Sequence, residues 1–299
     1  MKLKDLSLKD KGLFNKFLKL TRHELCVYTF ENIYIWKKLF DIRWAVIENS
    51  LCVFFKDKMG CFLYLAPLAK TQNLQAIQKV FRALDRFNKN KDVSRIENIE
   101  EKEIAFYEKA GFICRNKSYD YLCLRSDLAR LSGNKFKSKR ASFNYFIKHY
   151  AFQYLPFSSK DRDGCLKLYD SWMRERQGKN QDHIYQAMLE DSRKSLKNAL
   201  ANYADLNFTG GLVRINKQIR AFTFGFKLNK DTFSILYEIT DLSIKGLSQF
   251  VFSRFCQDLK GYKYINIMDD SGLENLQKVK LSYHPLRLVP AYIAERKNG

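Results

Sequence analysis

Residues 264–285 read Tyr264-Ile-Asn-Ile-Met-Asp-Asp-Ser-Gly-Leu-Glu-Asn-Leu-Gln-Lys-Val-Lys-Leu-Ser-Tyr-His-Pro285. This stretch predicts a strand that ends at Asn266, a polar turn, and a helix that carries Lys280 and Tyr283. Polar residues that follow a strand collect at its carboxyl end, where open α/β sheets bind ligands. The stretch therefore predicts an α/β fold and the position of its functional site.

Strands and helices also alternate on the N-terminal side of this stretch. Within residues 128–299 we expect strands over 152–157, 211–216, 219–228, 232–238, 262–267 and 286–293, and helices over 135–150, 161–176, 183–200, 246–259 and 272–282. Residues 1–127 show a similar order, with helices over 7–20, 24–39, 71–90 and 100–110 and strands over 42–48, 51–56, 61–65, 93–97, 112–115 and 119–124. The repeat predicts an α/β (α+β) protein of two domains, residues 1–127 and 128–299.

The composition is that of a folded protein in a reducing compartment. Hydrophobic residues make up 46% of the 299 residues and include 24 Phe and 17 Tyr, so a core can be filled and disorder is excluded. No run approaches the ~18 apolar residues of a membrane span, and the charged N-terminus does not resemble a signal peptide. The 7 cysteines are scattered without a CxxC pair, which predicts reduced core residues and no metal site. We expect a cytoplasmic protein.

The net charge of +21 favours a polyanionic partner such as nucleic acid or an anionic membrane face. Solvated lysines without such a partner are the alternative. Residues 128–160 contain no Asp or Glu, and the helix expected there carries a basic face. We predict that the polyanion-binding residues are Lys135, Lys137, Lys139, Arg140 and Lys148.

The stretch 264–285 resembles the signature of an uncharacterised bacterial domain family related to the C-terminal catalytic domain of phosphatidylglycerol lysyltransferase. Residues 131–140, Leu-Ser-Gly-Asn-Lys-Phe-Lys-Ser-Lys-Arg, are similar to a motif at the start of the second domain in that family. Segments 24–36, 119–122 and 221–223 are similar as well. The resemblance covers most of the chain and implies two tandem GNAT-like acyltransferase domains, akin to the Fem peptidyltransferases, each with a mostly antiparallel mixed sheet flanked by helices.

The resemblance to a GNAT fold places an acyl donor between two splayed strands of the C-terminal domain and its phosphates at the next helix N-terminus. In this chain that turn contains Lys245 and Gly246, where free N–H groups would receive a phosphate. A plain turn is the alternative, because only one glycine is present. The equivalent turn of the N-terminal domain, residues 66–72, has no glycine. That domain is therefore expected to be degenerate and to act as scaffold or acceptor-side wall.

Candidate catalytic residues cluster near the same strands. Glu238 ends one strand, Asn266 ends the next parallel strand, and Asp269 follows it. Because acyl transfer needs a proton acceptor and a stabilised oxyanion, we predict Glu238 or Asp269 as the acceptor or as the holder of a substrate ammonium group. Lys280 or Tyr283 would donate to the oxyanion or leaving group, and Asn266 would contact the donor. We expect Glu238, Asn266, Asp269 and Lys280 to share one pocket; a helix cap for Asp269 and a surface position for Lys280 are the alternatives.

Three functions stay open on the sequence alone. The first, implied by the resemblance, is transfer of an aminoacyl group from aminoacyl-tRNA to a lipid headgroup or another acceptor. The second is CoA-dependent N-acyl transfer with acyl-CoA as the donor. The third is a non-catalytic polyanion-binding module. No resident cofactor is predicted; tRNA and an anionic membrane surface are the expected partners, and the latter would hold the protein peripherally at the inner membrane face.

Overall fold

The computed structural model describes residues 2–297, and these residues form two compact units. Unit 1 comprises residues 2–120, 269–272 and 289–297. Unit 2 comprises residues 121–268 and 273–288. The expected domain boundary at residues 127/128 stays a prediction, and the two units are described separately below.

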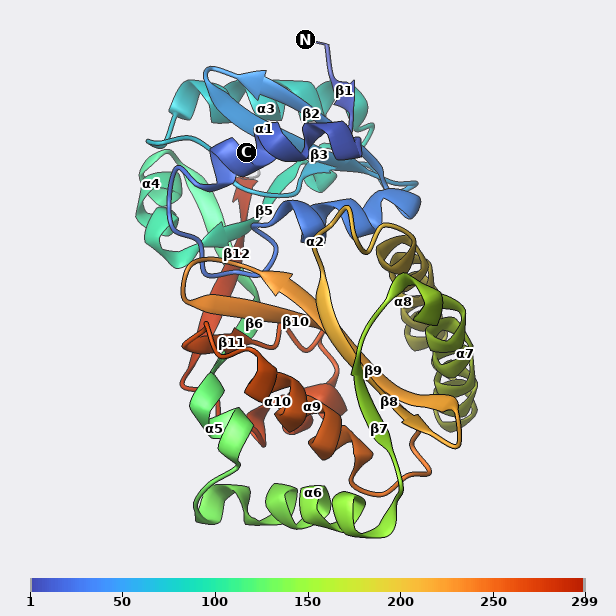
Figure 1. Ribbon diagram of the computed structural model, residues 1–299. Helices are drawn as coiled ribbons and strands as arrows, with labels where there is room; N and C mark the ends of the chain where they lie inside the picture. Colours follow the sequence, from blue (N-terminus) through green and yellow to red (C-terminus); the bar gives the residue numbers. More distant parts are fainter. Residues whose placement is uncertain (1, 298–299) are drawn as a thin grey trace. The chain divides into compact units, whose positions relative to one another are not determined.

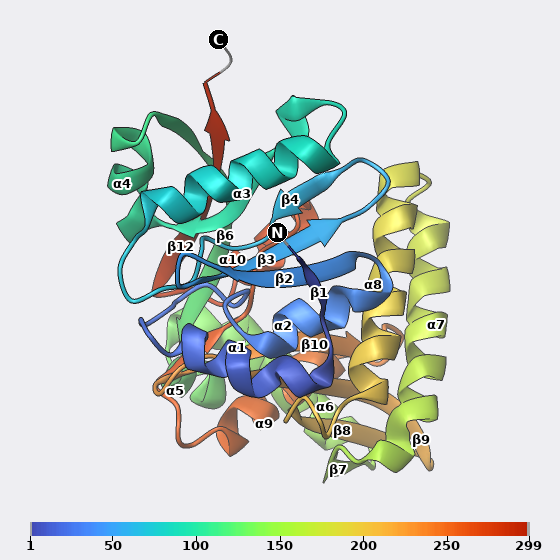
Figure 2. The same ribbon diagram turned by 90° about the horizontal axis from the view of Figure 1, so that it is seen from above.

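Unit 1 is a mixed sheet with helices on both faces (Figures 1 and 2). Its strands are β1 (Lys4–Asp5), β2 (Asp41–Ile47), β3 (Ser50–Lys56), β4 (Cys61–Leu63), β5 (Arg95–Glu100), the first part of β6 (Phe112–Leu124) and most of β12 (Arg287–Arg296). Its α-helices are α1 (Lys11–Leu18), α2 (Phe30–Ile35), α3 (Leu74–Phe87) and α4 (Ile104–Lys109). Strands β1 to β4 are antiparallel neighbours, whereas β4 and β5 are parallel and meet at Leu63 and Ile96.

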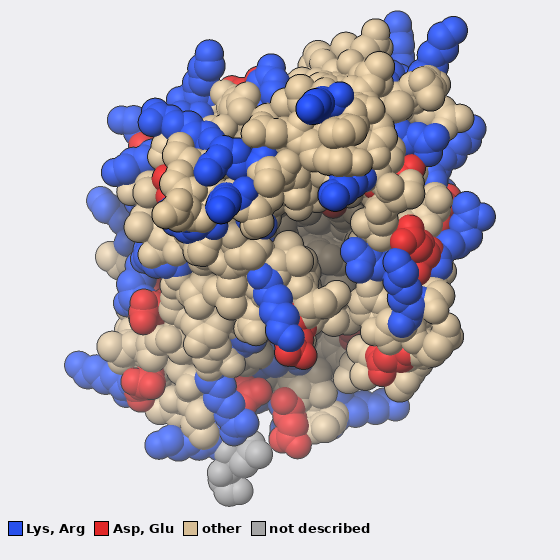
Figure 3. All heavy atoms as spheres, turned by 90° about the horizontal axis from the view of Figure 1, so that it is seen from below, with Lys and Arg blue, Asp and Glu red and all other residues tan. Residues whose placement is uncertain are grey.

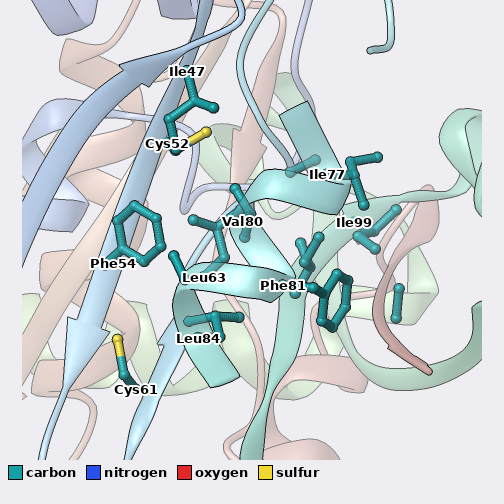
Figure 4. Close-up of a cluster of buried hydrophobic side chains, with 14 of the residues drawn as sticks. Ile47, Cys52, Phe54, Cys61, Leu63, Ile77, Val80, Phe81, Leu84 and Ile99 are labelled. Carbon is teal, nitrogen blue, oxygen red and sulfur yellow. The ribbon is translucent and has the colours of Figure 1, made fainter. Parts of the chain in front are cut away.

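Side chains along the strands of unit 1 point alternately to the two faces of the sheet, and each face packs against its own layer of helices. Ala45 and Ile47 of β2 face α3 and belong to a buried cluster with Val80, Phe81 and Leu84. Figure 4 labels most of these side chains. Trp44 of β2 points the opposite way and meets Phe14 of α1 edge-on at 5.8 Å. Because successive strand residues face opposite sides of the sheet, one strand serves both layers.

Unit 2 contains the helices α5 (Arg125–Arg130), α6 (Lys137–His149), α7 (Arg162–Lys179), α8 (His183–Ala201), α9 (Leu247–Asp258) and α10 (Glu274–Leu281). Its strands are the end of β6, β7 (Gln153–Pro156), β8 (Thr209–Ile215), β9 (Gln218–Lys227), β10 (Thr232–Thr240) and β11 (Tyr264–Asn266), in the sheet order β6-β11-β10-β9-β8-β7. Figures 1 and 2 show α7 and α8 side by side. The hydroxyl of Tyr237 in β10 donates a hydrogen bond to helix α8 on one face of the sheet. Ile235 of the same strand packs on the other face, in a buried hydrophobic cluster that includes residues of α9.

The parallel strands β10 and β11 stay paired over only three residues. Ser234 lies opposite Asn266 in the last pair. Strand β11 ends there, but β10 continues to Thr240 with β9 as its antiparallel neighbour. The carboxyl-terminal part of β10 is therefore a sheet edge on its β11 side, and this edge is where the candidate site lies.

Two expectations about elements are wrong. The closing strand, expected to complete the second domain, pairs with β5 of unit 1, for example through Ala291 and Glu100. The helix expected over residues 24–39 contains only α2 and a 3-10 turn. Its first part forms a turn, with the Tyr28 N–H bonded to the Leu25 main-chain oxygen, because the Glu24 N–H donates to Glu100 at 2.7 Å and the Cys26 N–H donates to Asp120 at 2.7 Å.

No helix between residues 2 and 297 is both long enough and apolar enough to cross a membrane. All seven cysteines are free thiols, and six of them are buried. In the same range, no group of His, Cys, Asp and Glu side chains has an arrangement that could hold a metal ion.

Candidate functional site

Glu238 occupies the open part of β10 in unit 2. It lies four residues beyond Ser234, where β10 has already lost its parallel partner, and its side chain is half-buried. Burial raises the pKa of the Glu238 carboxyl to about 8, and the charges of Lys139 and Lys280 oppose that rise. No described residue forms a hydrogen bond or an ion pair with this carboxyl. Unit 2 thus holds a carboxyl group whose pKa lies close to neutral and whose oxygens have no protein partner.

Thr223 of β9 is the direct cross-strand neighbour of Glu238. Opposed residues of an antiparallel pair point to the same face of the sheet, with Cβ atoms about 5 Å apart. The Thr223 side chain is fully buried, and its Oγ1 has no hydrogen-bond partner among the described residues. Since buried hydroxyls are nearly always hydrogen-bonded, this orphan group is a second sign of a binding site. Thr223 lies in segment 221–223, which is similar to the family, but no role was predicted for it from the sequence.

Lys139 of α6 is one of the five residues that were predicted to bind a polyanion. Its Nζ donates to Ser282 Oγ at 2.8 Å and lies 3.7 Å from the ring centroid of Tyr283. Burial lowers the pKa of Lys139, while the charge of Glu238 opposes that fall. The helical spacing contains a signal for this position, because Lys139 falls between Phe136 and Phe143 on the apolar stripe of the helix.

Tyr283 follows α10 and is buried beneath Lys139. Its ring also contacts Phe252 of α9, with centroids 4.5 Å apart. Burial raises the pKa of the Tyr283 hydroxyl well above its ordinary value, and Glu238 contributes to the rise. The structure therefore brings Tyr283, Lys139 and Glu238 into one electrostatic group within unit 2.

Lys280 is buried on the inner side of α10. Its Nζ donates to the main-chain oxygens of Ile267 and Met268, the latter at 3.2 Å, and it lies 5.8 Å from the ring centroid of Tyr121. These contacts fix the chain where it leaves β11. Lys280 is thus close enough to lower the pKa of Glu238, yet at least two of its three N–H groups are used by the protein.

Asn266 and Asp269 have different surroundings. Asn266 is fully buried and its Oδ1 accepts the Met268 N–H at 2.7 Å, which stabilises the turn after β11. Asp269 belongs to unit 1. There, burial is the main cause of the raised pKa of the Tyr64 hydroxyl, and the charge of Asp269 makes a smaller contribution to the rise. Asp269 is therefore not among the residues that unit 2 itself brings to Glu238.

The turn before α9 contains Lys245 and Gly246. Gly246 has φ +82°, and a Cβ at this position would lie 2.1 Å from the main-chain oxygen of Ser142 in α6. The glycine is therefore required for the close packing of α9 on α6. Lys245 is exposed, and its ammonium lies 4.6 Å from the ring centroid of Tyr145.

The five predicted polyanion-binding residues divide into two groups. Lys135 pairs with Asp127 at 2.7 Å, Lys139 belongs to the Glu238 group, and Arg140 donates to the main-chain oxygens of residues 131 and 133. Lys137 and Lys148 are exposed and have no described partner. On the face drawn in Figure 3, Lys and Arg side chains are spread over many places with uncharged surface between them.

The parallel strands β4 and β5 of unit 1 resemble the short parallel pair β10 and β11 of unit 2, but side-chain hydrogen bonds connect the ends of β4 and β5. The Asn98 amide donates to the main-chain oxygen of Tyr64 at 2.8 Å, and the Tyr28 hydroxyl donates to the main-chain oxygen of Asn98 at 2.8 Å. The Tyr64 hydroxyl donates in turn to Asn32. These bonds join the residue that follows β4 to β5; the scaffold role expected for this part of the chain stays a prediction.

The family model described as "Phosphatidylglycerol lysyltransferase, C-terminal" matches residues 18–295. No curated protein matches the chain. A conserved protein of unknown function from Bacteroides thetaiotaomicron VPI-5482 has a TM-score of 0.87 and 31% identity, with 98% of this chain and 99% of that chain covered.

Two further solved structures share the fold at low sequence identity. The C-terminal domain of a predicted lysylphosphatidylglycerol synthetase from Agrobacterium fabrum has a TM-score of 0.67 and 15% identity, with 98% and 93% of the two chains covered. A tandem GNAT protein from the clavulanic acid biosynthesis pathway has a TM-score of 0.50 and 7% identity, with 100% and 99% covered. The predicted fold class, a GNAT-like α/β protein, is confirmed. The chain belongs to the family of phosphatidylglycerol lysyltransferase C-terminal domains.

Proposed function

We propose that this protein is an aminoacyltransferase that moves an aminoacyl group from aminoacyl-tRNA to the amine or hydroxyl group of an acceptor such as a lipid headgroup. Membership of the phosphatidylglycerol lysyltransferase family supports this class of reaction. The observation that carries the proposal is Glu238, a half-buried carboxyl with a pKa of about 8 and no partner among the described residues. A general base works best when its pKa lies near the working pH.

Glu238 would act on the attacking nucleophile. The ionised carboxylate removes the proton from the acceptor amine or hydroxyl as its nitrogen or oxygen bonds to the acyl carbon. The ester bond between that carbon and the tRNA ribose oxygen then breaks, and the proton passes from Glu238 to the departing oxygen. The carboxylate is regenerated, so the step balances without another reactant.

The turn before α9 gives CoA-dependent transfer less support. Its single glycine is explained by the packing of α9 on Ser142, and Lys245 lies over Tyr145. The helix that starts there, α9, begins with the Leu247 N–H bonded to the Ile244 main-chain oxygen. Aminoacyl-tRNA is therefore the preferred donor in the proposal.

Replacement of Glu238 by Gln tests the proposal. The substitution keeps the shape and removes the titratable group, so kcat/KM should fall by about 100-fold or more. The assay would measure transfer of a radiolabelled amino acid from charged tRNA to phosphatidylglycerol vesicles, with peptide and small-amine acceptors in parallel. For the unmodified protein, the rate should rise with pH through about 8 as Glu238 ionises.

Glu190→Gln is the matched control, because it alters an exposed carboxylate in α8 and should leave the rate unchanged. A parallel reaction with acetyl-CoA or longer acyl-CoA donors would follow thiol release. Thiol release that requires Glu238, without transfer from any charged tRNA, would replace the proposal with CoA-dependent acyl transfer.

A further inference from the structure

The two cations around Glu238 differ in what they can offer to a ligand. Lys280 is buried, and its ammonium already holds the main-chain oxygens of Ile267 and Met268. A ligand that drew Lys280 away would take the donor from the Ile267 carbonyl group, which costs on the order of 1–3 kcal/mol, and would leave the Met268 oxygen with only the Tyr121 N–H at 3.3 Å. Lys280 is therefore best explained as a positioning residue for the end of β11.

Lys139 has donor capacity left. Its half-buried ammonium makes one hydrogen bond, to Ser282 Oγ at 2.8 Å, and one contact with the ring of Tyr283 at 3.7 Å. An ammonium group has three donors, so N–H groups of Lys139 stay available to a ligand. Glu238 and Lys139 influence each other's pKa, although they lie beyond ion-pair distance. A ligand oxygen bound to Lys139 would therefore be held by a cation that interacts electrostatically with a proton acceptor.

Thr223 independently indicates a ligand in this group. Its hydroxyl is fully buried next to Glu238 and has no described hydrogen-bond partner. A hydroxyl buried without a partner costs on the order of 1–3 kcal/mol, and a bound oxygen or amine would relieve that cost. The same ligand that approaches Glu238 would reach Thr223, because cross-strand neighbours stand side by side.

We propose that Lys139 is the oxyanion-binding residue of this site. The inference rests on the proposed aminoacyl transfer. As the acceptor nucleophile bonds to the acyl carbon, the carbonyl π electrons move onto the carbonyl oxygen, and that negative oxygen accepts an N–H bond from Lys139. When the ester bond to the ribose oxygen breaks, the electrons return to re-form the carbonyl group. The Thr223 hydroxyl holds the nucleophile beside Glu238.

Aminomethylphosphonate and glycinamide form a matched pair of probes for this role. Both carry an ammonium group, but the first has a tetrahedral anionic centre and the second a planar neutral carbonyl group. The unmodified protein should bind the phosphonate more tightly in ligand-observed NMR titrations. Lys139→Met should weaken phosphonate binding by about tenfold, the loss of one hydrogen bond to a charged group, and leave glycinamide binding unchanged.

Two further variants make the result specific. Lys197→Met removes an exposed cation of α8 and should change neither affinity. Ser282→Ala keeps the charge of Lys139 but removes its anchor, so an intermediate loss of phosphonate affinity is expected even if Lys139→Met fails to fold. In the transfer assay, Lys139→Met should lower kcat by about 100-fold, as expected for loss of one oxyanion donor.

Equal effects of Lys197→Met and Lys139→Met, or no preference of the unmodified protein for the phosphonate, would overturn the assignment. If transfer proceeds while Lys139→Met binds the phosphonate normally, only the role of Lys139 is wrong. If phosphonate binding depends on Lys139 but no charged tRNA serves as donor, the oxyanion site stands and the proposed donor is wrong.

Discussion

Glu103 is a second carboxyl with a strongly displaced pKa, and it lies in unit 1, at the start of α4. Burial, helped by the charge of Glu100, raises its pKa to about 7. Its Oε2 is buried without a described hydrogen-bond partner. Glu100 itself is well paired, because His23 lies 2.9 Å from it and Lys102 lies 2.6 Å from it. The protonated form of Glu103 is therefore the one that the folded protein prefers.

Glu103→Gln should change the pH dependence of stability. A folded-state pKa above the unfolded value contributes stability that is complete below about pH 4.5 and is lost as the pH rises through 7. The wild-type protein should lose roughly 2 kcal/mol relative to Glu103→Gln between pH 5 and 8.5. Urea unfolding at several pH values measures this difference. Glu108→Gln, an exposed change in the same helix, should give a curve parallel to wild type; a parallel curve for Glu103→Gln would contradict the account.

The sequence predicted where Glu238 lies along the chain better than it predicted which residues surround it. Glu238 was predicted to end a strand over residues 232–238, since strand ends in α/β sheets collect functional groups; β10 instead continues to Thr240, and Glu238 lies beyond the point where its parallel partner ends. Its neighbours could not be predicted in the same way. Lys139 reaches it because α6 packs on α9 through Phe143, and Asp269 falls in unit 1. Both facts depend on contacts between segments more than 90 residues apart in the chain.

Helix α6 carries two sets of side chains with different roles. Its inner side contributes Phe143 and Phe146 to the packing on Phe250 of α9, and the backbone near Ser142 meets Gly246. Its outer side exposes Lys137 and Lys148, which have no described partner. This outer side is the part of the predicted basic face that is available to a polyanion.

Charge reversal at Lys137 and Lys148 tests that outer side of α6. If the helix contacts tRNA or anionic vesicles, the double Glu variant should bind at least tenfold more weakly, and the slope of log K against log salt should fall by roughly one to two units. Fluorescence anisotropy across a salt series measures both quantities. Reversal of the exposed pair Lys89 and Lys91 in unit 1 changes the net charge equally. A similar loss in that control would show that only total charge matters.

Elements defined by local chemistry were predicted well. The hairpin between β8 and β9 turns at Asn216 and Lys217, which both have positive φ, 50° and 65°, as residues of tight turns do. The segment 24–28 was predicted wrongly as a helix, because its backbone N–H groups donate to the carboxylates of Glu100 and Asp120. A local pattern cannot report a hydrogen bond that forms with a residue more than 70 positions away.

At the scale of the molecule, chain order and unit membership differ. Strand β12 follows all of unit 2 in sequence, yet its residues from Val289 onward belong to unit 1. There Ala291 and Ala294 are buried against the unit 1 core, and Tyr292 pairs with Ile99 of β5. The sequence predicted the strand but placed it in the wrong unit, because a duplicated order of elements carries no information about which sheet the last strand joins.

Deletion of residues 289–299 should therefore destabilise unit 1. The deletion removes the antiparallel partner of β5 and several buried side chains, a loss of several kcal/mol. In hydrogen exchange, amides of β2, β3 and β5 should lose protection, while those of β8 and β9 should retain it. A chain that ends at residue 297 keeps all of β12 and is the control. Equal protection in unit 1 for both chains would show that β12 is dispensable.

The late position of β12 also has a consequence for biosynthesis. Translation proceeds through roughly 190 residues between Glu100 and Arg287, which takes on the order of 10–40 s at elongation rates of roughly 5–20 residues per second. During that interval β5 has been made but its antiparallel partner has not. An unpaired strand edge can pair with other nascent chains, so β5 is exposed to such pairing until β12 has been made and has joined it.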